Sequence, residues 1–291
     1  MKQKKIVAVL GGDARQAYAA RTLLLLGFGV RQHHVPRVEG VETGEVTESI
    51  KEAITGAQIV LGPTPWREID VAETGDALED GQTLAGGWVP KELRARCGAK
   101  NVTVHDLLLR EDFNTLGTIA TAEGAIAQAI THSAGSLHGS HALVLGYGRC
   151  AKPLAKKLQG LGAHVAVTAR RWEAACTAIA DGCEVLDDSL LGCHLPRFAY
   201  IFNTVPAPVL GEARLRRTQP EVTIIDIATA PGGVDFAAAK TLARNARLCP
   251  GLPGQYAPRS AGEHIAQTVR IILEEQEGSP WGWNHCVPGL E

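Results

Sequence analysis

The sequence predicts an α/β protein of two domains, each a parallel sheet covered by helices. Three observations lead to this fold class. The chain has 291 residues, 45% of them hydrophobic and 21% charged, and this length suits two domains better than one small core. Short apolar runs alternate with helical patterns in two blocks, 6–105 and 141–249. Because the second block begins with G-x-G-x-x-A between a strand and a helix, it predicts a Rossmann-type NAD(P)-binding domain.

The first domain is expected at residues 1–135 as a compact α/β layer. Its first strand is followed by the turn Gly11-Gly12 and an apolar helix, and these begin a βαβ unit. The glycines of this turn lack the G-x-G-x-x-G spacing, so it predicts no second dinucleotide site. Strands are expected at 5–10, 29–34, 58–61, 83–85 and 101–105, with a polar stretch at 37–47.

Two helices are expected to join the domains. Residues 118–133 carry isoleucine and many small side chains at helical spacing, which favours a long connecting helix. A final helix is expected to start at Ser260 as its N-cap, with Glu263 completing a capping box, and to return to the first domain. Residues 256–291 are therefore assigned to the first domain. The tail from 278 onward has no periodicity and predicts no element.

The second domain is expected at residues 136–255 as a Rossmann sheet of six parallel strands. The strands are predicted at 143–146, 165–168, 184–186, 199–202, 222–227 and 246–249. After the first of them, one glycine makes the tight turn, the second admits a pyrophosphate, and Ala151 packs the helix on the sheet. The predicted cofactor-binding residues of this turn are Gly146, Tyr147, Gly148, Arg149 and Cys150. The alternative is a βα turn that is merely tight.

The end of the second Rossmann strand indicates which cofactor binds. NAD sites usually place an acidic residue there for the ribose 2′-OH, whereas NADP sites place cations there for the 2′-phosphate. Here the position offers Thr168, Arg170 and Arg171, so NADP is the first choice and NAD the second. The alternative is that the two arginines only solvate the start of the next helix.

Loops rich in glycine and proline follow the later Rossmann strands. Such loops suit a flat nicotinamide, because backbone amides can bind its carboxamide. The alternative is ordinary turn chemistry. Further cofactor contacts are predicted from Asn203, Thr204, Val205, Pro206 and Gly254.

Charge and composition exclude several classes of partner. The formal net charge of −2 argues against an electrostatic surface for nucleic acid or for a membrane. The apolar run 6–10 is too short for a signal peptide or a membrane span, so we expect a cytoplasmic protein. Seven cysteines without C-x-x-C spacing and ten histidines without H-x-x-x-H spacing predict no metal site.

Several motifs together resemble the family of dipicolinate synthase A subunits. They are Gly-Gly-Asp-Ala-Arg-Gln at 11–16, His-Gly-Ser at 138–140, Asn-Thr-Val-Pro at 203–206, Pro-Gly-Gly-Val-Asp-Phe at 231–236 and Pro-Gly-Leu-Pro-Gly at 250–254. The chain departs from the family at Ala120, where a proline is frequent, and at Ala230, where a basic residue is frequent.

The resemblance implies an NAD(P)-dependent oxidoreductase that works with a flavoprotein-like B subunit. The pair would convert dihydrodipicolinate, or its hydroxylated tetrahydro precursor, into dipicolinate for bacterial spores. We also expect a homo-oligomer.

That reaction needs a hydride acceptor, a base, and cations for the substrate's two carboxylates. Arg15 is the first choice for a carboxylate clamp, with a surface ion pair as its alternative and Arg259 as a weaker second clamp. Hydride transfer is expected in a cleft between the domains. The candidate bases are Asp13, Glu123 and His138. Their respective alternatives are a helix cap, a helix-face charge and a linker histidine.

Two other functions share this layout. The first is a dehydrogenase of the methylenetetrahydrofolate or shikimate type, although the lysine base expected there has no obvious counterpart in the first domain. The second is a non-catalytic sensor or regulatory protein that binds a nicotinamide nucleotide.

Overall fold

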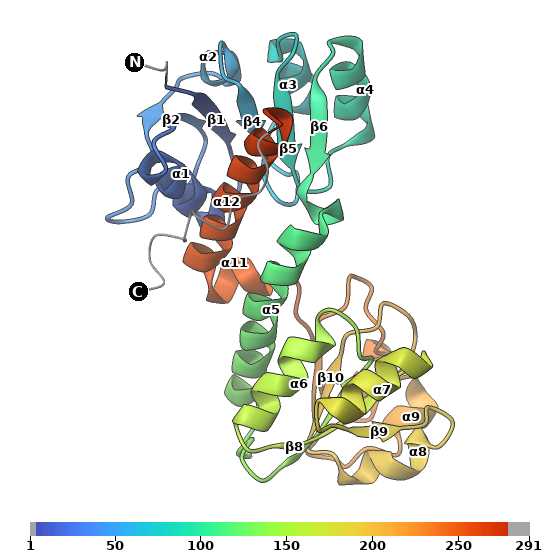
Figure 1. Ribbon diagram of the computed structural model, residues 1–291. Helices are drawn as coiled ribbons and strands as arrows, with labels where there is room; N and C mark the ends of the chain where they lie inside the picture. Colours follow the sequence, from blue (N-terminus) through green and yellow to red (C-terminus); the bar gives the residue numbers. More distant parts are fainter. Residues whose placement is uncertain (1–3, 279–291) are drawn as a thin grey trace. The chain divides into compact units, whose positions relative to one another are not determined.

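The computed structural model describes residues 4–278, which form two compact units (Figure 1). Unit 1 comprises residues 4–116 and 258–278, and unit 2 comprises residues 117–257. The division lies within one continuous helix, α5 (Glu111–Thr131), whereas the sequence-based boundary was drawn after this helix, at residue 135. α5 also starts seven residues earlier than predicted from its apolar spacing, because its first turn carries the acidic Glu111 and Asp112, which favour a helix N-terminus.

Unit 1 contains a six-stranded parallel sheet in the order β3-β2-β1-β4-β5-β6. The strands are β1 (Ile6–Leu10), β2 (Gly29–His33), β3 (Glu45–Val46), β4 (Ile59–Leu61), β5 (Thr83–Gly86) and β6 (Thr103–Asp106). Five of them confirm predicted strands. β3 lies inside the stretch expected to be only polar, because two exposed residues at a sheet edge leave no hydrophobic pattern.

Helices cover both faces of this sheet, and β1 is therefore buried on both sides. Val7 and Val9 share a core with α1 (Ala14–Leu25) and α12 (Pro258–Gln276), while Ala8 and Leu10 face a second core. The second core is formed by α2 (Ile50–Ile54), α3 (Val71–Ala77) and α4 (Lys91–Ala99), and a short 3₁₀ helix, η1, spans Leu107–Leu109. This layering positions the turn after β1 at the carboxyl edge of a rigid sheet.

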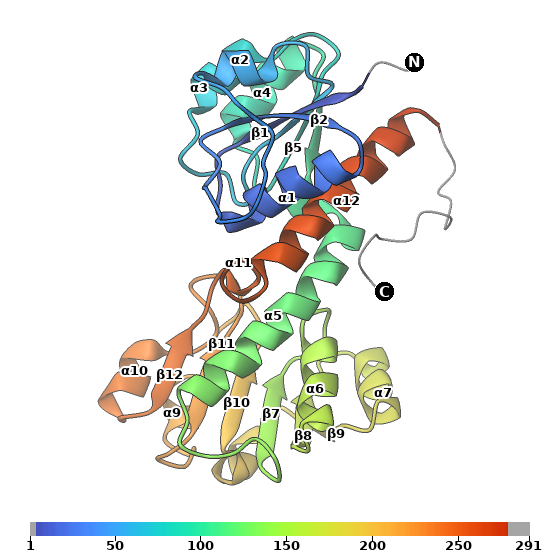
Figure 2. The same ribbon diagram turned by 90° about the vertical axis from the view of Figure 1, so that its left-hand side faces the viewer.

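The C-terminal helix α12 packs along α1, as Figure 2 shows, which confirms that it returns to the first unit. Gly262 allows this close approach, since a Cβ atom there would lie 2.5 Å from the backbone oxygen of Arg15. The predicted capping box is wrong, because α12 already begins at Pro258. The Glu263 carboxylate instead accepts a hydrogen bond from Arg259 at 2.9 Å, one helical turn earlier.

Unit 2 contains a second parallel sheet, in the order β12-β11-β10-β7-β8-β9. The strands are β7 (His141–Leu145), β8 (His164–Thr168), β9 (Glu184–Leu186), β10 (Tyr200–Asn203), β11 (Thr223–Asp226) and β12 (Asn245–Leu248). Counted from β7, the order is 3-2-1-4-5-6, so the predicted Rossmann sheet is confirmed.

The helices of unit 2 also lie on both faces of its sheet. They are α5, α6 (Ala151–Gly160), α7 (Trp172–Ala180), α8 (Leu191–His194), α9 (Glu212–Leu215), α10 (Phe236–Thr241) and α11 (Leu252–Tyr256), with a 3₁₀ helix, η2, at Leu195–Arg197. α11 occupies the stretch that was expected to be an open loop. The proline at its second position suits the first turn of a helix, where its missing N–H leaves no bond unmade.

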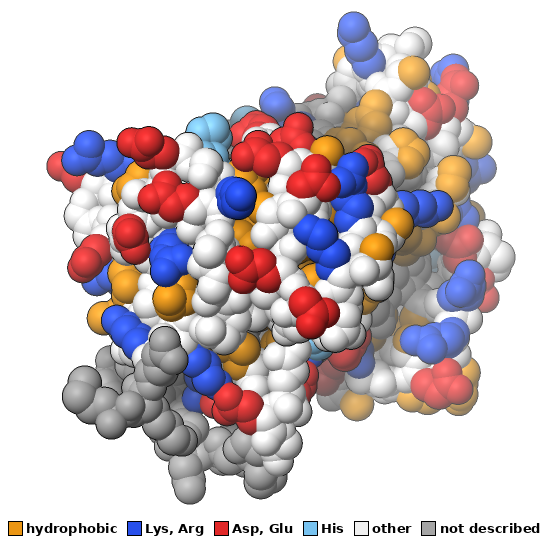
Figure 3. Space-filling model, turned by 90° about the horizontal axis from the view of Figure 1, so that it is seen from above, with side chains coloured by type: hydrophobic (Ala, Val, Ile, Leu, Met, Phe, Trp, Pro, Cys, Tyr) orange, Lys and Arg blue, Asp and Glu red, His pale blue; other side chains and the backbone are white. Residues whose placement is uncertain are grey.

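The surface carries charges of both signs. On the face drawn in Figure 3, lysine and arginine side chains are interspersed with aspartate and glutamate. In the part of the chain from residue 4 to residue 278, no helix has both the length and the hydropathy to cross a membrane.

Candidate functional site

The glycine turn of unit 2 follows β7 and requires glycine at its first position. Gly146 has φ +93°, and a Cβ atom there would lie 2.8 Å from the Thr204 hydroxyl and 2.9 Å from Val205. At Gly148 the position of a Cβ atom is open, with no heavy atom within 4 Å, and the residue is exposed. One side of the turn is therefore tightly packed and the other is accessible to a ligand.

The N-terminus of α6, which leads away from this turn, has no side-chain cap. Cys150 holds the N-cap position and makes no capping hydrogen bond. Burial raises the pKa of its thiol, which favours a packing role over a reactive thiolate. The first amides of a helix bind anions readily, so this N-terminus fits a dinucleotide pyrophosphate. Arg149, beside it in the turn, is exposed.

Thr168, at the end of β8, fixes the glycine turn. Its buried hydroxyl accepts a hydrogen bond of 2.9 Å from the Gly146 amide. Thr168 was predicted, with Arg170 and Arg171, to lie at the cofactor. Its hydroxyl is bonded to the glycine turn and positions that turn, and a direct contact with the cofactor stays a prediction.

Tyr147 lies in the glycine turn, but its side chain points into the core of unit 2. The side chain is buried, and its hydroxyl donates to the Asp181 carboxylate at 2.6 Å. Burial, reinforced by Asp181, holds the pKa of the phenol above its ordinary value. The Tyr147 hydroxyl is thus bonded to Asp181 and anchors the turn, and the predicted contact of this residue with the cofactor stays a prediction.

Arg170 and Arg171 follow β8 and remain available for a ligand. Both are exposed, and neither guanidinium group forms a hydrogen bond or an ion pair with another residue in the described range 4–278. Arg171 is the N-cap residue of α7, yet no side chain caps this helix. The two guanidinium groups and the helix N-terminus together form a cationic site at the end of the second Rossmann strand.

A buried Asn203–Asp226 pair holds the loops that follow β10 and β11. The Asn203 amide donates to Asp226 at 2.8 Å and to the Val205 carbonyl at 3.0 Å. Asp226 also accepts from the Gly233 amide at 2.7 Å and the Ala228 amide at 3.0 Å. Asn203 is fully buried and links the two loops, and its predicted contact with the cofactor stays a prediction. Sequence reasoning missed Asp226, although an aspartate that ends an apolar strand is a recognisable signal.

The remaining predicted contacts of unit 2 lie at its carboxyl edge. Thr204 donates to the Leu145 carbonyl at 2.8 Å, which ties its loop to β7, and Val205 packs beside Gly146. Pro206 is exposed, whereas Gly254 lies within α11. The structure therefore brings Thr204 and Val205 to the glycine turn.

The second polar site is the turn after β1 in unit 1. Gly11 and Gly12 have φ of +50° and +89°, and Asp13 caps α1 by accepting from the Arg15 amide at 3.0 Å. The Arg15 guanidinium donates to the same carboxylate at 2.8 and 2.7 Å, and also to the Thr64 carbonyl. Burial alone would raise the pKa of Asp13, but the contacts with Arg15 outweigh it and hold the pKa below its ordinary value.

The other two candidate bases lie away from the glycine turn of unit 2. Glu123 pairs at 2.8 Å with Lys157, in the last turn of α6, whereas the glycine turn precedes the first. His138 packs against Gly162 at the amino end of β7 and β8. A five-residue strand of roughly 16 Å separates that edge from the glycine turn. Neither base is brought to the edge where the nucleotide is predicted to bind.

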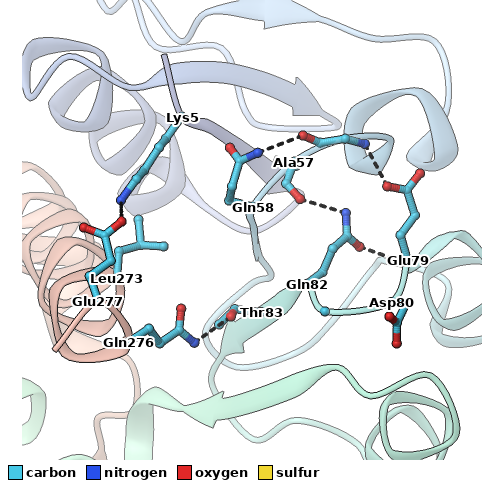
Figure 4. A pocket seen from close by; sticks show the side chains of 12 residues that line it. Lys5, Ala57, Gln58, Glu79, Asp80, Gln82, Thr83, Leu273, Gln276 and Glu277 are labelled. Carbon is cyan, nitrogen blue, oxygen red and sulfur yellow. Dashed lines mark hydrogen bonds and ion pairs between the residues drawn. The ribbon is translucent and has the colours of Figure 1, made fainter. Parts of the chain in front are cut away.

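A pocket of about 400 Å³ opens at the amino-terminal edge of the unit 1 sheet (Figure 4). Its polar groups mostly satisfy one another: Gln82 donates to two backbone carbonyls, and Gln276 donates to Thr83 at 2.7 Å. None of the predicted site residues lines it. Open α/β sheets bind ligands at the carboxyl ends of their strands, whereas this pocket lies at the opposite edge.

Comparisons with known proteins extend over both units. A family model for the N-terminal domain of the dipicolinate synthase A subunit matches residues 6–108. The dipicolinate synthase A subunit of Bacillus subtilis (strain 168) is 30% identical over 290 residues, covering 92% of this chain and 96% of the relative. The family model lies wholly within unit 1, so the similarity does not rest on the Rossmann unit alone.

Solved structures show the same relationship. The crystal structure of the dipicolinate synthase A subunit from Bacillus halodurans has a TM-score of 0.83 and 27% identity, covering 92% of this chain and 97% of that chain. A transhydrogenase from Sinorhizobium meliloti has a TM-score of 0.71 and 15% identity, covering 94% of each chain, and shares the fold.

Proposed function

Because the chain belongs to the family of dipicolinate synthase A subunits, we propose that it oxidises dihydrodipicolinate, or its hydroxylated tetrahydro precursor, to dipicolinate with NADP. The observation that carries the proposal is the similarity over 92% of the chain, together with the family model over residues 6–108, which includes the turn after β1. The similarity thus extends to the turn proposed for the substrate as well as to the unit proposed for the nucleotide.

Unit 2 has the residues to hold the dinucleotide. The open position at Gly148 and the uncapped start of α6 suit the pyrophosphate. Arg170 and Arg171 suit the 2′-phosphate, since both guanidinium groups are exposed and unpaired within residues 4–278. Thr168 and the Asn203–Asp226 pair keep these surfaces in place. NADP therefore stays the first choice and NAD the second.

From dihydrodipicolinate the reaction removes a hydride and a proton of the ring, and aromatisation provides the driving force; the hydroxylated tetrahydro precursor must also lose its hydroxyl group as water. NADP, when bound, supplies the hydride acceptor. The residues of this chain bind and orient the two partners. Arg15 is the cation proposed for one substrate carboxylate, because its guanidinium is largely buried and lies at a strand-end turn. Asp13, beside it, is the candidate base in unit 1.

The physiological setting follows from the family. We propose that the chain works with a flavoprotein-like B subunit, forms a homo-oligomer, and acts in the cytoplasm of a spore-forming bacterium. The name of the relative supports a partner subunit; the homo-oligomer, the cytoplasmic location and the role in spores are proposals.

Purified protein should be incubated with dihydrodipicolinate and NADP, with and without the B subunit. Appearance of the dipicolinate absorbance, together with NADPH, would support the proposal. Absence of dipicolinate in every combination would refute it, and NADPH binding without turnover would point to a nucleotide sensor.

A further inference from the structure

The Arg15 guanidinium in unit 1 already binds a carboxylate, that of Asp13, in the bidentate manner expected for a substrate carboxylate. Its Nε and Nη2 groups donate side by side to the two carboxylate oxygens of Asp13, at 2.8 and 2.7 Å. Nη2 also donates to the Thr64 carbonyl. Among residues 4–278 no acceptor bonds to Nη1. A second carboxylate cannot bind Arg15 in a bidentate manner unless it displaces the Asp13 carboxylate or the Thr64 carbonyl.

Of the two acceptors, only Asp13 is free to leave. The Thr64 carbonyl belongs to a segment whose backbone is bonded on both sides. The Trp66 backbone amide donates to the Gly87 carbonyl at 2.8 Å, and the Gly87 amide donates to the Pro63 carbonyl at 3.1 Å. The Asp13 side chain is 51% exposed, whereas that of Arg15 is 15% exposed. Moving an exposed carboxylate fully into water costs little free energy, and the guanidinium stays hydrogen-bonded to the Thr64 carbonyl.

The arrangement around Arg15 leaves other polar groups unmatched. Gln16 Oε1, Thr64 Oγ1 and Trp66 Nε1 are buried without a hydrogen-bond partner. The orientation of the Gln16 amide is fixed, since its nitrogen donates to the Gly62 carbonyl at 3.0 Å. All three atoms belong to segment 62–66 or to a side chain bonded to it. Unmatched buried groups gathered at one strand-end turn are expected of a binding site in its free state.

We propose that the Asp13 carboxylate holds the place of a substrate carboxylate on Arg15, and that a pyridine or dihydropyridine 2,6-dicarboxylate exchanges with it. The inference rests on the proposed function and adds a step to it. On exchange, the substrate gains the Nε and Nη2 donors and the Arg15 amide at the start of α1, which Asp13 holds in the free state. The twelve-residue helix α1 adds its N-terminal dipole.

The exchange is tested by measuring the affinity of the full-length protein for pyridine-2,6-dicarboxylate by calorimetry. Asp13→Asn removes the competing charge but keeps a good helix cap. It should tighten binding about fivefold, the upper limit of what an exposed ion pair contributes. Asp70→Asn is the matched control, since Asp70 caps α3 by accepting from the Glu73 amide at 2.7 Å and has no cation partner within residues 4–278. It should leave the affinity unchanged.

Arg15→Gln separates failure of the exchange from failure of the proposed function. If Arg15→Gln weakens binding but Asp13→Asn leaves it unchanged or weaker, the exchange is refuted while the carboxylate site stands. If neither dicarboxylate nor NADPH binds to the wild-type protein, the proposed function fails and the exchange fails with it. Equal thermal unfolding temperatures of Asp13→Asn and Asp70→Asn would show that the comparison is free of a folding difference.

Discussion

Replacing both Arg170 and Arg171 by glutamine is expected to weaken NADPH binding about 30-fold and to change NADH binding less than about twofold. NADPH differs from NADH only by the 2′-phosphate, which is the group these two guanidinium side chains are proposed to bind. Loss of the cations should therefore affect one nucleotide and spare the other.

The magnitude follows from the surroundings of the two arginines. Neither guanidinium group forms a hydrogen bond or an ion pair within residues 4–278, so replacing the two side chains breaks no bond inside the described protein. At an exposed site a charge-assisted contact with phosphate contributes about 1 kcal/mol, and two such contacts correspond to about a 30-fold change in the dissociation constant.

The assay is a fluorescence titration with NADPH and NADH in parallel. Arg216→Gln serves as the control, because Arg216 is also exposed and pairs with Glu212 on α9, within the same unit. Equal weakening of both nucleotides by the double substitution would contradict our assignment of the cofactor. Weakening by the control alone would contradict the location of the site.

Three further predictions concern the framework. Gly146→Ala should abolish NADPH binding in the same titration, because φ is +93° and the added methyl group would meet atoms at 2.8 and 2.9 Å. Asp226→Asn should lower the free energy of unfolding in urea by about 3 kcal/mol, because a buried acceptor for several donors becomes partly a donor. A change near zero would contradict the role of Asp226 in holding the two loops together. Arg110 holds the pKa of Asp112 and of Glu275 below their ordinary 3.8 and 4.5, so its contribution to stability is full above about pH 5 and decreases as the pH falls through the lowered values; Arg110→Gln should thus reduce the melting temperature more at pH 7 than at pH 2.

The fold was largely predictable because both sheets are parallel and buried on two faces. Strands such as β1 and β7 then appear as continuous apolar runs between glycine turns, which is a strong local signal. β3 was missed because two exposed residues leave no such signal. The start of α12 was misplaced because Ser260 and Glu263 match a capping box by spacing alone, and α12 begins two residues earlier, at Pro258.

The candidate site was only partly predictable, because side-chain direction depends on tertiary packing. The sequence indicated which loops meet at the edge of the Rossmann sheet. It did not reveal that Tyr147 and Asn203 turn inward or that the Thr168 hydroxyl bonds to the glycine turn. In each case a long-range partner decides the role, and Asp226, twenty-three residues after Asn203, is an example.

The most direct test of the account is the stoichiometry of oxidation in a single turnover. Wild-type protein with the B subunit, excess NADP and a limiting amount of dihydrodipicolinate should yield one NADPH for each dipicolinate formed. Dipicolinate that appears at the same rate without nucleotide, or NADPH that appears without dipicolinate, would contradict the assignment of this chain as the nicotinamide-dependent partner of the pair.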